Sequence, residues 1–579
     1  MKHPKLTYTS KTLFFTTSPR TPSKLIPEVE LLINDFEGRP WNKETQSDFM
    51  KSLSAQDFFE QVAPTKNLDF SARDRVNRGP QLLGFVNLEN GVAKTEPYEK
   101  LITGKRINEL FLRQMLKFQV PSPIRPVSDD STSVFWCRPY LEIIRLIYEM
   151  GYLSRDEMAI YGMQLTNYHK FEEIKEKIAD FRSKKALRSG ISYSKFIRSI
   201  SNTEVLALFS DVISLGKAKK RENKGKTSTV EEFVSTKVRN MYDYADACRR
   251  YLRITGLVNV DIKRRSVSIA PNRAEETKWL LDHIDREPVF VDDLEKYQRY
   301  LFDTSAPMLY SDNRTQLCQR LSKFGYQNDD LMADTIDGLK DKYELALSES
   351  TKESISKEEE SLRTYEDYDD IMSVFQSLAD RNTPDRPLLL EWNTWRAMTM
   401  LDHGMIDGNF SRDMNGNPEE TAGPGEPDII CHYKDYDLII EVTMQSGHRQ
   451  YNSEGEPVAD HVGEHRIASG KPTYCLFIAP VINDNVITYF YGIDQMNMRS
   501  YGGKSQIIPM TIDMFQELIK GSKQSKDKPN SDNIREFLDK TISDISGSSN
   551  EDNWYESIKA NINDFMKITS QRTGSSIGA

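Results

Sequence analysis

The sequence predicts a multidomain protein that combines α+β and α/β parts. Three observations support this class. The 579 residues suffice for about three or four domains. Apolar residues follow helical spacing through most of the first 375 positions, and short apolar runs separated by turns occur between positions 425 and 510. The expected divisions are 1–95, 96–275, a helical linker over 276–375, an α/β domain over 376–565 and a disordered tail over 566–579.

Composition excludes several classes of protein. The apolar share is 38%, too high for a disordered chain, and no run reaches the roughly 18 consecutive apolar residues of a membrane span. The N-terminus has no apolar signal core. Five cysteines lie far apart, without the pairing typical of disulfide or zinc frameworks, so a cytoplasmic location is expected.

Charge is distributed unevenly along the chain. The formal net charge is −10, which by itself argues against a nucleic-acid partner. Residues 181–265, however, contain 20 Lys and Arg against 8 Asp and Glu, a local +12 that leaves −22 on the rest. This window predicts either a surface that meets a polyanion or a solvated basic loop.

The end of the basic window has the outline of a winged helix. Residues 231–254 have helical spacing and end at Thr255-Gly256, and two short strands follow around the turn 261–265. In a winged helix the helix enters the major groove and the hairpin follows the backbone. An ordinary helix–hairpin unit is the alternative. The candidate DNA contacts here are Lys237, Arg239, Arg249, Arg250, Arg253, Lys263, Arg264 and Arg265.

Two acids stand out in a predicted hairpin over residues 425–443. Pro427-Asp428 opens the first apolar run, and Glu441-Val442-Thr443 closes the second. If Tyr433 pairs with Leu438, Asp428 lies opposite Thr443 and Glu441 is a diagonal neighbour on the same face, close enough to share a divalent ion. Acids on apolar strands need a partner charge, which a metal supplies.

The surroundings of this hairpin add candidate groups. Five of the eight histidines lie between positions 403 and 465. We single out His461 for proton transfer and expect the others to be surface residues. Upstream, Glu391 is either a third metal-side carboxylate or an exposed acid in the first turn of a helix.

Several segments together resemble type IIS restriction endonucleases of the AlwI kind, which include strand-specific nicking enzymes. The matching segments are Thr17 to Arg20, Phe70 to Arg75, Tyr251 to Leu257, Glu391 to Trp395, Pro427-Asp428, Glu441 to Thr443 and Tyr474 to Pro480. The resemblance implies a two-part DNA-recognition region with a winged helix, a helical linker and a C-terminal PD-(D/E)xK-type α/β nuclease domain similar to that of FokI.

The resemblance also implies roles for individual residues. Glu391, Asp428 and Glu441 would form the acidic core, with Mg²⁺ held by Asp428, Glu441 and the carbonyl of Val442. Glu454 and His461 would be auxiliary catalytic residues. Thr443 occupies the position of the usual motif lysine, as in the family. Base reading in double-stranded DNA is expected from Arg20, Arg73 and Arg75 together with the winged helix.

Three classes of function remain open at this point. The first is an Mg²⁺-dependent type IIS endonuclease that cuts a few base pairs outside a short asymmetric site, and its close rival is a nicking enzyme. One active site cuts one strand, so double-strand cleavage needs a second copy or a small nuclease subunit. A winged-helix DNA-binding protein without nuclease activity and a phosphoesterase acting on small nucleotides are the rivals from other classes.

Overall fold

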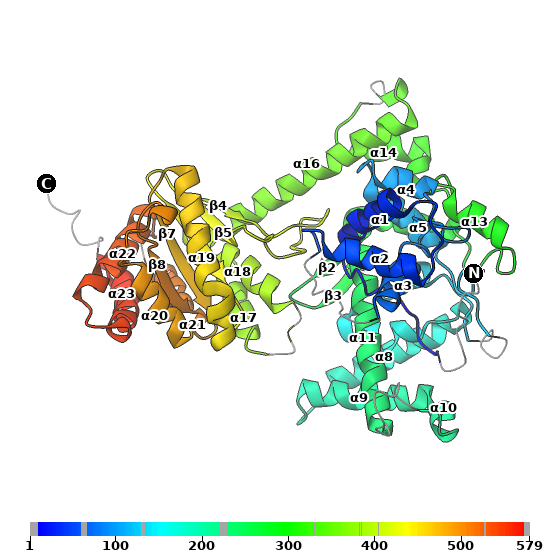
Figure 1. The fold of residues 1–579 in the computed structure, drawn as a ribbon, viewed down its shortest axis with the longest axis horizontal. Helices are drawn as coiled ribbons and strands as arrows, with labels where there is room; N and C mark the ends of the chain where they lie inside the picture. The colour runs from blue at the N-terminus through cyan, green and yellow to red at the C-terminus, as the bar shows by residue number, and fades with distance from the viewer. Residues whose placement is uncertain are drawn as a thin grey trace. The chain divides into compact units, whose positions relative to one another are not determined.

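The fold comes from a computed structural model of the 579-residue chain. It describes residues 10–571 except 60–66, 129–133, 219–228, 328–330, 381–382, 384, 403 and 526–527, and it describes side chains as far as 565. The chain divides into two compact units, residues 1–347 and 348–579 (Figure 1). Both helices and sheets are present, which confirms the mixed class expected from the sequence.

The N-terminal unit (residues 1–347) is mainly helical. Its main core is one continuous cluster of apolar side chains from Leu13 to Leu309, so residues of the segments 1–95 and 96–275 share a core, and a smaller cluster runs from Leu317 to Leu347. The predicted division of this unit remains a prediction. Its α-helices are α1 (Pro22–Phe36), α2 (Lys43–Ser54), α3 (Leu68–Arg78), α4 (Glu96–Leu101), α5 (Ile107–Lys117), α6 (Pro139–Met150), α7 (Arg155–Ile160), α8 (Phe171–Ala186), α9 (Tyr193–Leu208), α10 (Ser210–Ser214), α11 (Val230–Ile254), α12 (Ala274–His283), α13 (Leu294–Phe302) and α14 (Arg314–Lys323).

The expected helix and hairpin at the end of the basic window are present. Helix α11 ends at Ile254, and Gly256 follows with φ +68°, a backbone conformation that glycine adopts readily. Strands β2 (Val258–Asp261) and β3 (Ser266–Ile269) pair antiparallel. A third strand, β1 (Tyr152–Ser154), joins them in the order β1-β3-β2.

The C-terminal unit (residues 348–579) is built around a five-stranded sheet. Helix α16 (Ile336–Arg363) contains the boundary between the units, within the predicted linker. The other helices of this unit are α17 (Tyr368–Ser377), α18 (Arg386–Leu401), α19 (His448–Ser469), α20 (Asp484–Ile493), α21 (Ile512–Gln524), α22 (Ser531–Ser543) and α23 (Glu551–Gln571). The predicted disordered tail begins at 566, whereas α23 continues to Gln571; residues 572–579 lie outside the described part of the chain.

The strand order of this sheet is β4-β5-β6-β7-β8. The strands are β4 (Met405–Gly408), β5 (Ile429–His432), β6 (Asp437–Val442), β7 (Thr473–Ala479) and β8 (Ile507–Thr511). The pairs β4–β5 and β5–β6 are antiparallel, and β6–β7 and β7–β8 are parallel. Every residue of β7 is buried, which requires cover on both faces. Figure 1 shows α19 running over the sheet, with α20 to α23 grouped at β7 and β8.

The predicted register of the hairpin was wrong by two residues. Leu438 pairs with Cys431, not with Tyr433. Tyr433 instead donates its backbone N–H to the carbonyl of Tyr436 at 3.1 Å, so only Lys434 and Asp435 form the loop. The two tyrosine rings pack 4.6 Å apart between centroids, which accounts for this tighter turn. A shift of two residues leaves every side chain on its original face.

None of the described helices combines the length and apolar composition that a membrane crossing requires.

Candidate active site

The candidate site begins where β5 and β6 come together. Ile429 pairs with Ile440, so Asp428 lies directly across from Glu441 at the next position. The backbone N–H of Val442 donates to Asp428 Oδ2 at 2.7 Å, which fixes the carboxylate at this end of the hairpin. The corrected register therefore places the two acids closer than the predicted diagonal would.

Two further acids converge on this pair. Glu391 on α18 is 2% exposed, and its Oε1 accepts a hydrogen bond from the backbone N–H of Ala422 at 2.8 Å. It is therefore not the exposed first-turn acid that the sequence left open. Glu454 on α19 accepts a hydrogen bond from the Thr443 hydroxyl at 2.9 Å. Thr443 therefore orients the Glu454 carboxylate.

His461 approaches the cluster from α19, which lies on the same face of the sheet. Its Nδ1 lies 2.8 Å from Glu441 Oε1, and the side chain is 17% exposed. This hydrogen bond raises the pKa of His461 above its ordinary value. Of the four clustered histidines that the structure describes, His461, the one selected from sequence, is the one bonded to the acidic pair; His403 lies outside the described residues.

Burial raises the pKa of all four carboxyl groups, and repulsion from neighbouring acids adds to it at Glu391, Asp428 and Glu454. Burial raises the pKa of Glu391 to about 8, and the negative charge of Glu441 adds to this effect. Burial and the charges of Glu441 and Glu391 hold the pKa of Asp428 well above its ordinary value. Burial also raises the pKa of Glu441 and of Glu454, against the hydrogen bonds from His461 and Thr443 respectively. Carboxyl groups held together in a buried site ionise together only when positive charge compensates them.

The chemistry of this donor set suits a divalent cation. Carboxylate oxygens are the ligands that Mg²⁺ prefers. Among the hydrogen bonds and ion pairs of the described residues, none brings a lysine or arginine to Glu391, Asp428, Glu441 or Glu454. Among the described residues, His461 is the one side chain able to carry a positive charge that these contacts bring to the cluster. A carbonyl ligand from Val442, at the end of β6, remains a prediction.

The candidate DNA contacts fall into two groups. Arg75 is 3% exposed and its guanidinium lies 3.1 Å from Glu28, while Arg253 is 5% exposed. Neither side chain can reach DNA without leaving the core. The remaining candidates are exposed or half-buried: Arg20, Arg73, Lys237, Arg239, Arg249, Arg250, Lys263, Arg264 and Arg265.

Ion pairs orient several of these exposed candidates. Arg20 pairs with Asp243 at 3.2 Å. Arg249 and Arg250 both contact Asp246, at 2.7 and 3.0 Å, and despite burial their charges lower the pKa of Asp246 to about 2. The basic segment 219–228 lies outside the described residues. DNA contact by any of these side chains remains a prediction.

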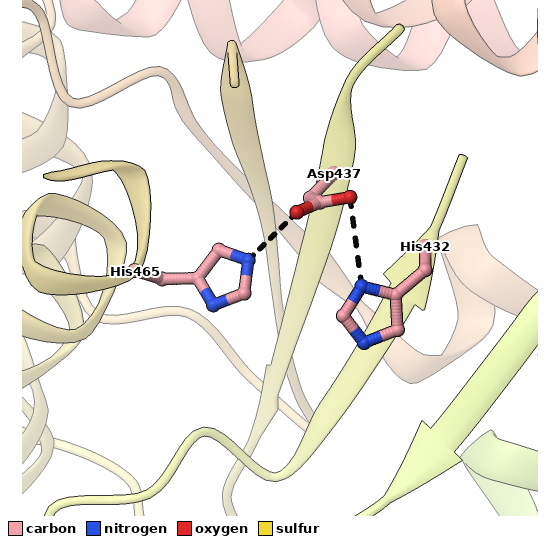
Figure 2. Close-up of side chains that lie close together, drawn as sticks. All are labelled: His432, Asp437 and His465. Carbon is pink, nitrogen blue, oxygen red and sulfur yellow. Dashed lines mark hydrogen bonds and ion pairs between the residues drawn. The ribbon is translucent and has the colours of Figure 1, made fainter. Parts of the chain in front are cut away.

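A second group of polar side chains, not predicted from the sequence, lies at the other end of the same hairpin. His432 and His465, which we expected to be surface histidines, both approach Asp437 (Figure 2). The signal available was spacing: His461 and His465 are four residues apart on one helix, so they share a face. The register that places His432 opposite Asp437 was needed to complete the group.

Together, the sheet and its carboxylates define an α/β domain with a buried acidic centre suited to a divalent cation. The sequence model of the AlwI restriction endonuclease family matches residues 83–518. The chain therefore belongs to the AlwI restriction endonuclease family and is a site-specific deoxyribonuclease.

Two solved structures are similar to parts of the chain. One is the small subunit (R.BspD6I2) of the heterodimeric restriction endonuclease R.BspD6I, with 25% identity over 35% of this chain and 100% of that one and a TM-score of 0.28. Another is the binding domain of the BpuJ1 endonuclease in complex with pyrene- and phenanthrene-modified DNA, with 16% identity over 48% and 92% of the two chains and a TM-score of 0.31. No curated protein matched the chain.

Proposed function

We propose that this nuclease is an Mg²⁺-dependent type IIS enzyme, which binds a short asymmetric site in double-stranded DNA and hydrolyses phosphodiester bonds a few base pairs outside it. The single observation that carries the hydrolytic part is the buried facing pair Asp428 and Glu441, joined by Glu391. Family membership supports the nuclease over the regulator and small-nucleotide alternatives.

The site residues divide the chemical work. Asp428 and Glu441 would hold Mg²⁺, with Glu391 and the Val442 carbonyl as further ligands. The ion would supply Lewis-acid stabilisation of the phosphate charge and a more acidic bound water. His461, hydrogen-bonded to Glu441 Oε1, is placed to hold and transfer a proton at its free nitrogen. Glu454 is held by the Thr443 hydroxyl, which keeps its carboxylate turned toward the cluster.

Recognition is assigned to the N-terminal unit. Helix α11 and the β2–β3 hairpin have the order of elements found in a winged helix, and Lys263 and Arg264 are exposed in the turn between the strands. Phosphate contacts would position this unit, and arginine contacts to guanine would supply specificity. The acidic cluster belongs to the C-terminal unit. Recognition and hydrolysis by separate units are compatible with cleavage outside the recognised DNA sequence.

One observation favours nicking as a second candidate. The described residues contain one such acidic cluster, on one sheet, and one centre hydrolyses one strand. Double-strand cleavage then requires a second copy of the chain or a small nuclease subunit.

Cleavage of supercoiled plasmid DNA tests the proposal. Wild-type protein with Mg²⁺ is expected to give open circles if it nicks and discrete linear fragments if it cuts both strands, with ends mapped to one offset from one site. Glu441→Gln should abolish cleavage and retain duplex binding, whereas Glu536→Gln, at an exposed position on α22, should behave as wild type. Full cleavage by Glu441→Gln would overturn the assignment.

A further inference from the structure

A second cluster lies at the opposite end of the hairpin that carries the acidic pair. In the register of β5 and β6, His432 is directly opposite Asp437, just as Asp428 is opposite Glu441. These positions differ by four residues along each strand, so all four side chains lie on one face of the sheet. Helix α19 supplies one histidine to each end, His461 to Glu441 and His465 to Asp437.

The second cluster has the composition and spacing of a metal site. His465 Nε2 lies 2.9 Å from Asp437 Oδ2, and His432 Nδ1 lies 3.6 Å from Asp437 Oδ1. One ligand atom from each of the three residues can be chosen so that all lie within 4.8 Å of one another. In tetrahedral zinc sites, with bonds of about 2.0–2.2 Å, ligand atoms are roughly 3.4 Å apart. A modest closure of the two imidazoles therefore reaches this geometry.

We propose that His432, Asp437 and His465 bind a divalent transition-metal ion of the zinc type, at a site separate from the Asp428–Glu441 centre. Figure 2 shows the carboxylate between the two imidazoles, which come from the end of β5 and from α19. Two imidazoles and one carboxylate favour zinc or a similar ion, whereas Mg²⁺ prefers oxygen ligands alone. The ion would join α19 to the hairpin.

The surroundings support this assignment. The side chain of Asp437 is 2% exposed, while those of His465 and His432 are 16% and 31% exposed, so the carboxylate is fixed and the cluster remains open to an incoming ion. Asp407 on β4 lies 3.4 Å from His432 Nε2, on the side away from Asp437. A carboxylate at the second nitrogen is the usual means of orienting a metal-binding histidine.

One neighbouring cation competes with a metal at this cluster. Lys471 Nζ lies 3.1 Å from Asp437 Oδ1 and also donates to the carbonyl of Tyr433 at 2.8 Å. It leaves Asp437 Oδ2 to face His465. Removing the lysine charge is therefore expected to strengthen metal binding, whereas in a purely structural ion-pair network it would only weaken the cluster.

Zinc binding to the full chain tests the site. The measurement uses the double variant Asp428→Asn/Glu441→Gln as the background protein, so that the Asp428–Glu441 centre does not contribute to metal binding. After metal removal, isothermal titration with Zn²⁺ in millimolar Mg²⁺ is expected to show one site per chain, and Co²⁺ is expected to give visible absorption typical of nitrogen and oxygen ligands. His465→Gln and His432→Gln should each weaken Zn²⁺ binding by about tenfold to a hundredfold. Lys471→Met should tighten it several-fold.

The control is His448→Gln, at an exposed position on the same helix α19, which should bind Zn²⁺ like the background protein. Circular dichroism of each variant establishes that it is folded, and the two histidine variants come from different elements. Absence of a stoichiometric zinc site in the background protein, or equal binding by His465→Gln, His432→Gln and His448→Gln, would overturn the proposal. These readouts do not depend on DNA cleavage, so failure of the proposed nuclease function would leave them intact.

Discussion

Asp428 and Glu441 face each other across the last position of the β5–β6 hairpin, one residue beyond the Ile429–Ile440 pair. The Val442 amide binds Asp428 at 2.7 Å and His461 binds Glu441 at 2.8 Å, so each carboxylate is held by a different partner. Two buried acids in this arrangement repel each other unless a cation joins them. This relationship is the basis of the predictions about catalysis.

Replacement of His461 by Gln is expected to reduce the rate of DNA cleavage by about 10²- to 10⁴-fold, the range for removal of a group that transfers a proton. Duplex binding should be unchanged, because His461 contacts Glu441 and lies in the C-terminal unit. Single-turnover cleavage and a gel-shift assay measure the two effects. His448→Gln, at the exposed start of the same helix, is the control, and an equal rate for both variants would refute the role of His461.

Without divalent metal, the stability of the protein should fall as pH rises. Because the pKa of Glu391 is raised to about 8 in the folded chain, this group binds a proton more tightly when folded than when unfolded. Its contribution is therefore present at acidic pH and is lost between about pH 5 and about pH 8, with a slope of at most about 1.4 kcal/mol per pH unit. Urea unfolding across this range measures the slope. Glu391→Gln should reduce it, leaving the contributions of the other buried carboxyl groups, and an unchanged slope in that variant would contradict the raised pKa.

The exposed basic residues of the β2–β3 turn should affect the salt dependence of DNA binding more than its specificity. Lys263 and Arg264 lie in the turn between β2 and β3, where the Arg264 side chain is 86% exposed. Replacing both by Ala should weaken duplex binding and reduce the slope of log K against log[salt] by about 0.9 for each phosphate that the protein no longer neutralises. Fluorescence anisotropy over a series of salt concentrations measures the slope. Lys278→Ala, exposed on α12, serves as control; an unchanged slope for the double variant would exclude the turn from the interface.

Arg75 should matter for stability instead of base reading. Its guanidinium is buried 3.1 Å from Glu28 and 5.0 Å from the ring of Phe59. Burial raises the pKa of Glu28 to about 7 even beside this arginine. Arg75→Met should cost about 3 kcal/mol, near the lower end for a broken buried pair because Glu28 can take up a proton. Denaturant unfolding measures this destabilisation, and the Glu28→Gln/Arg75→Met pair should recover part of it. Full stability together with abolished DNA binding would reverse this interpretation.

Local patterns were sufficient to predict much of the fold. Helix α11 with its Gly256 stop, the β2–β3 hairpin, and the buried runs of β7 and β8 all follow from residue spacing and turn residues. Strand β1 was not predicted, because it is three residues long and its partner β3 lies more than 100 positions later. Long-range pairing of this kind leaves little trace in a single sequence.

The candidate site shows the same limit. Pro427-Asp428 and Glu441 could be found by their placement on apolar strands. Their register, however, depended on the pairing of Tyr433 with Tyr436, and the polar residues between them favoured a longer loop in the prediction. The face was nevertheless correct, because an even shift preserves it. Glu391 had two interpretations until its burial was known. The group around Asp437 was missed because its members come from different elements, which only tertiary packing brings together.

The central claim, that Asp428 and Glu441 hold one divalent cation, is tested most directly by anomalous diffraction from crystals soaked in Mn²⁺, a substitute for Mg²⁺ with a measurable anomalous signal. The predicted result is one peak within bonding distance of Asp428 Oδ and Glu441 Oε, which disappears in Asp428→Asn crystals. A well-ordered site without such a peak at saturating Mn²⁺, or a peak bound to neither carboxylate, would contradict the claim.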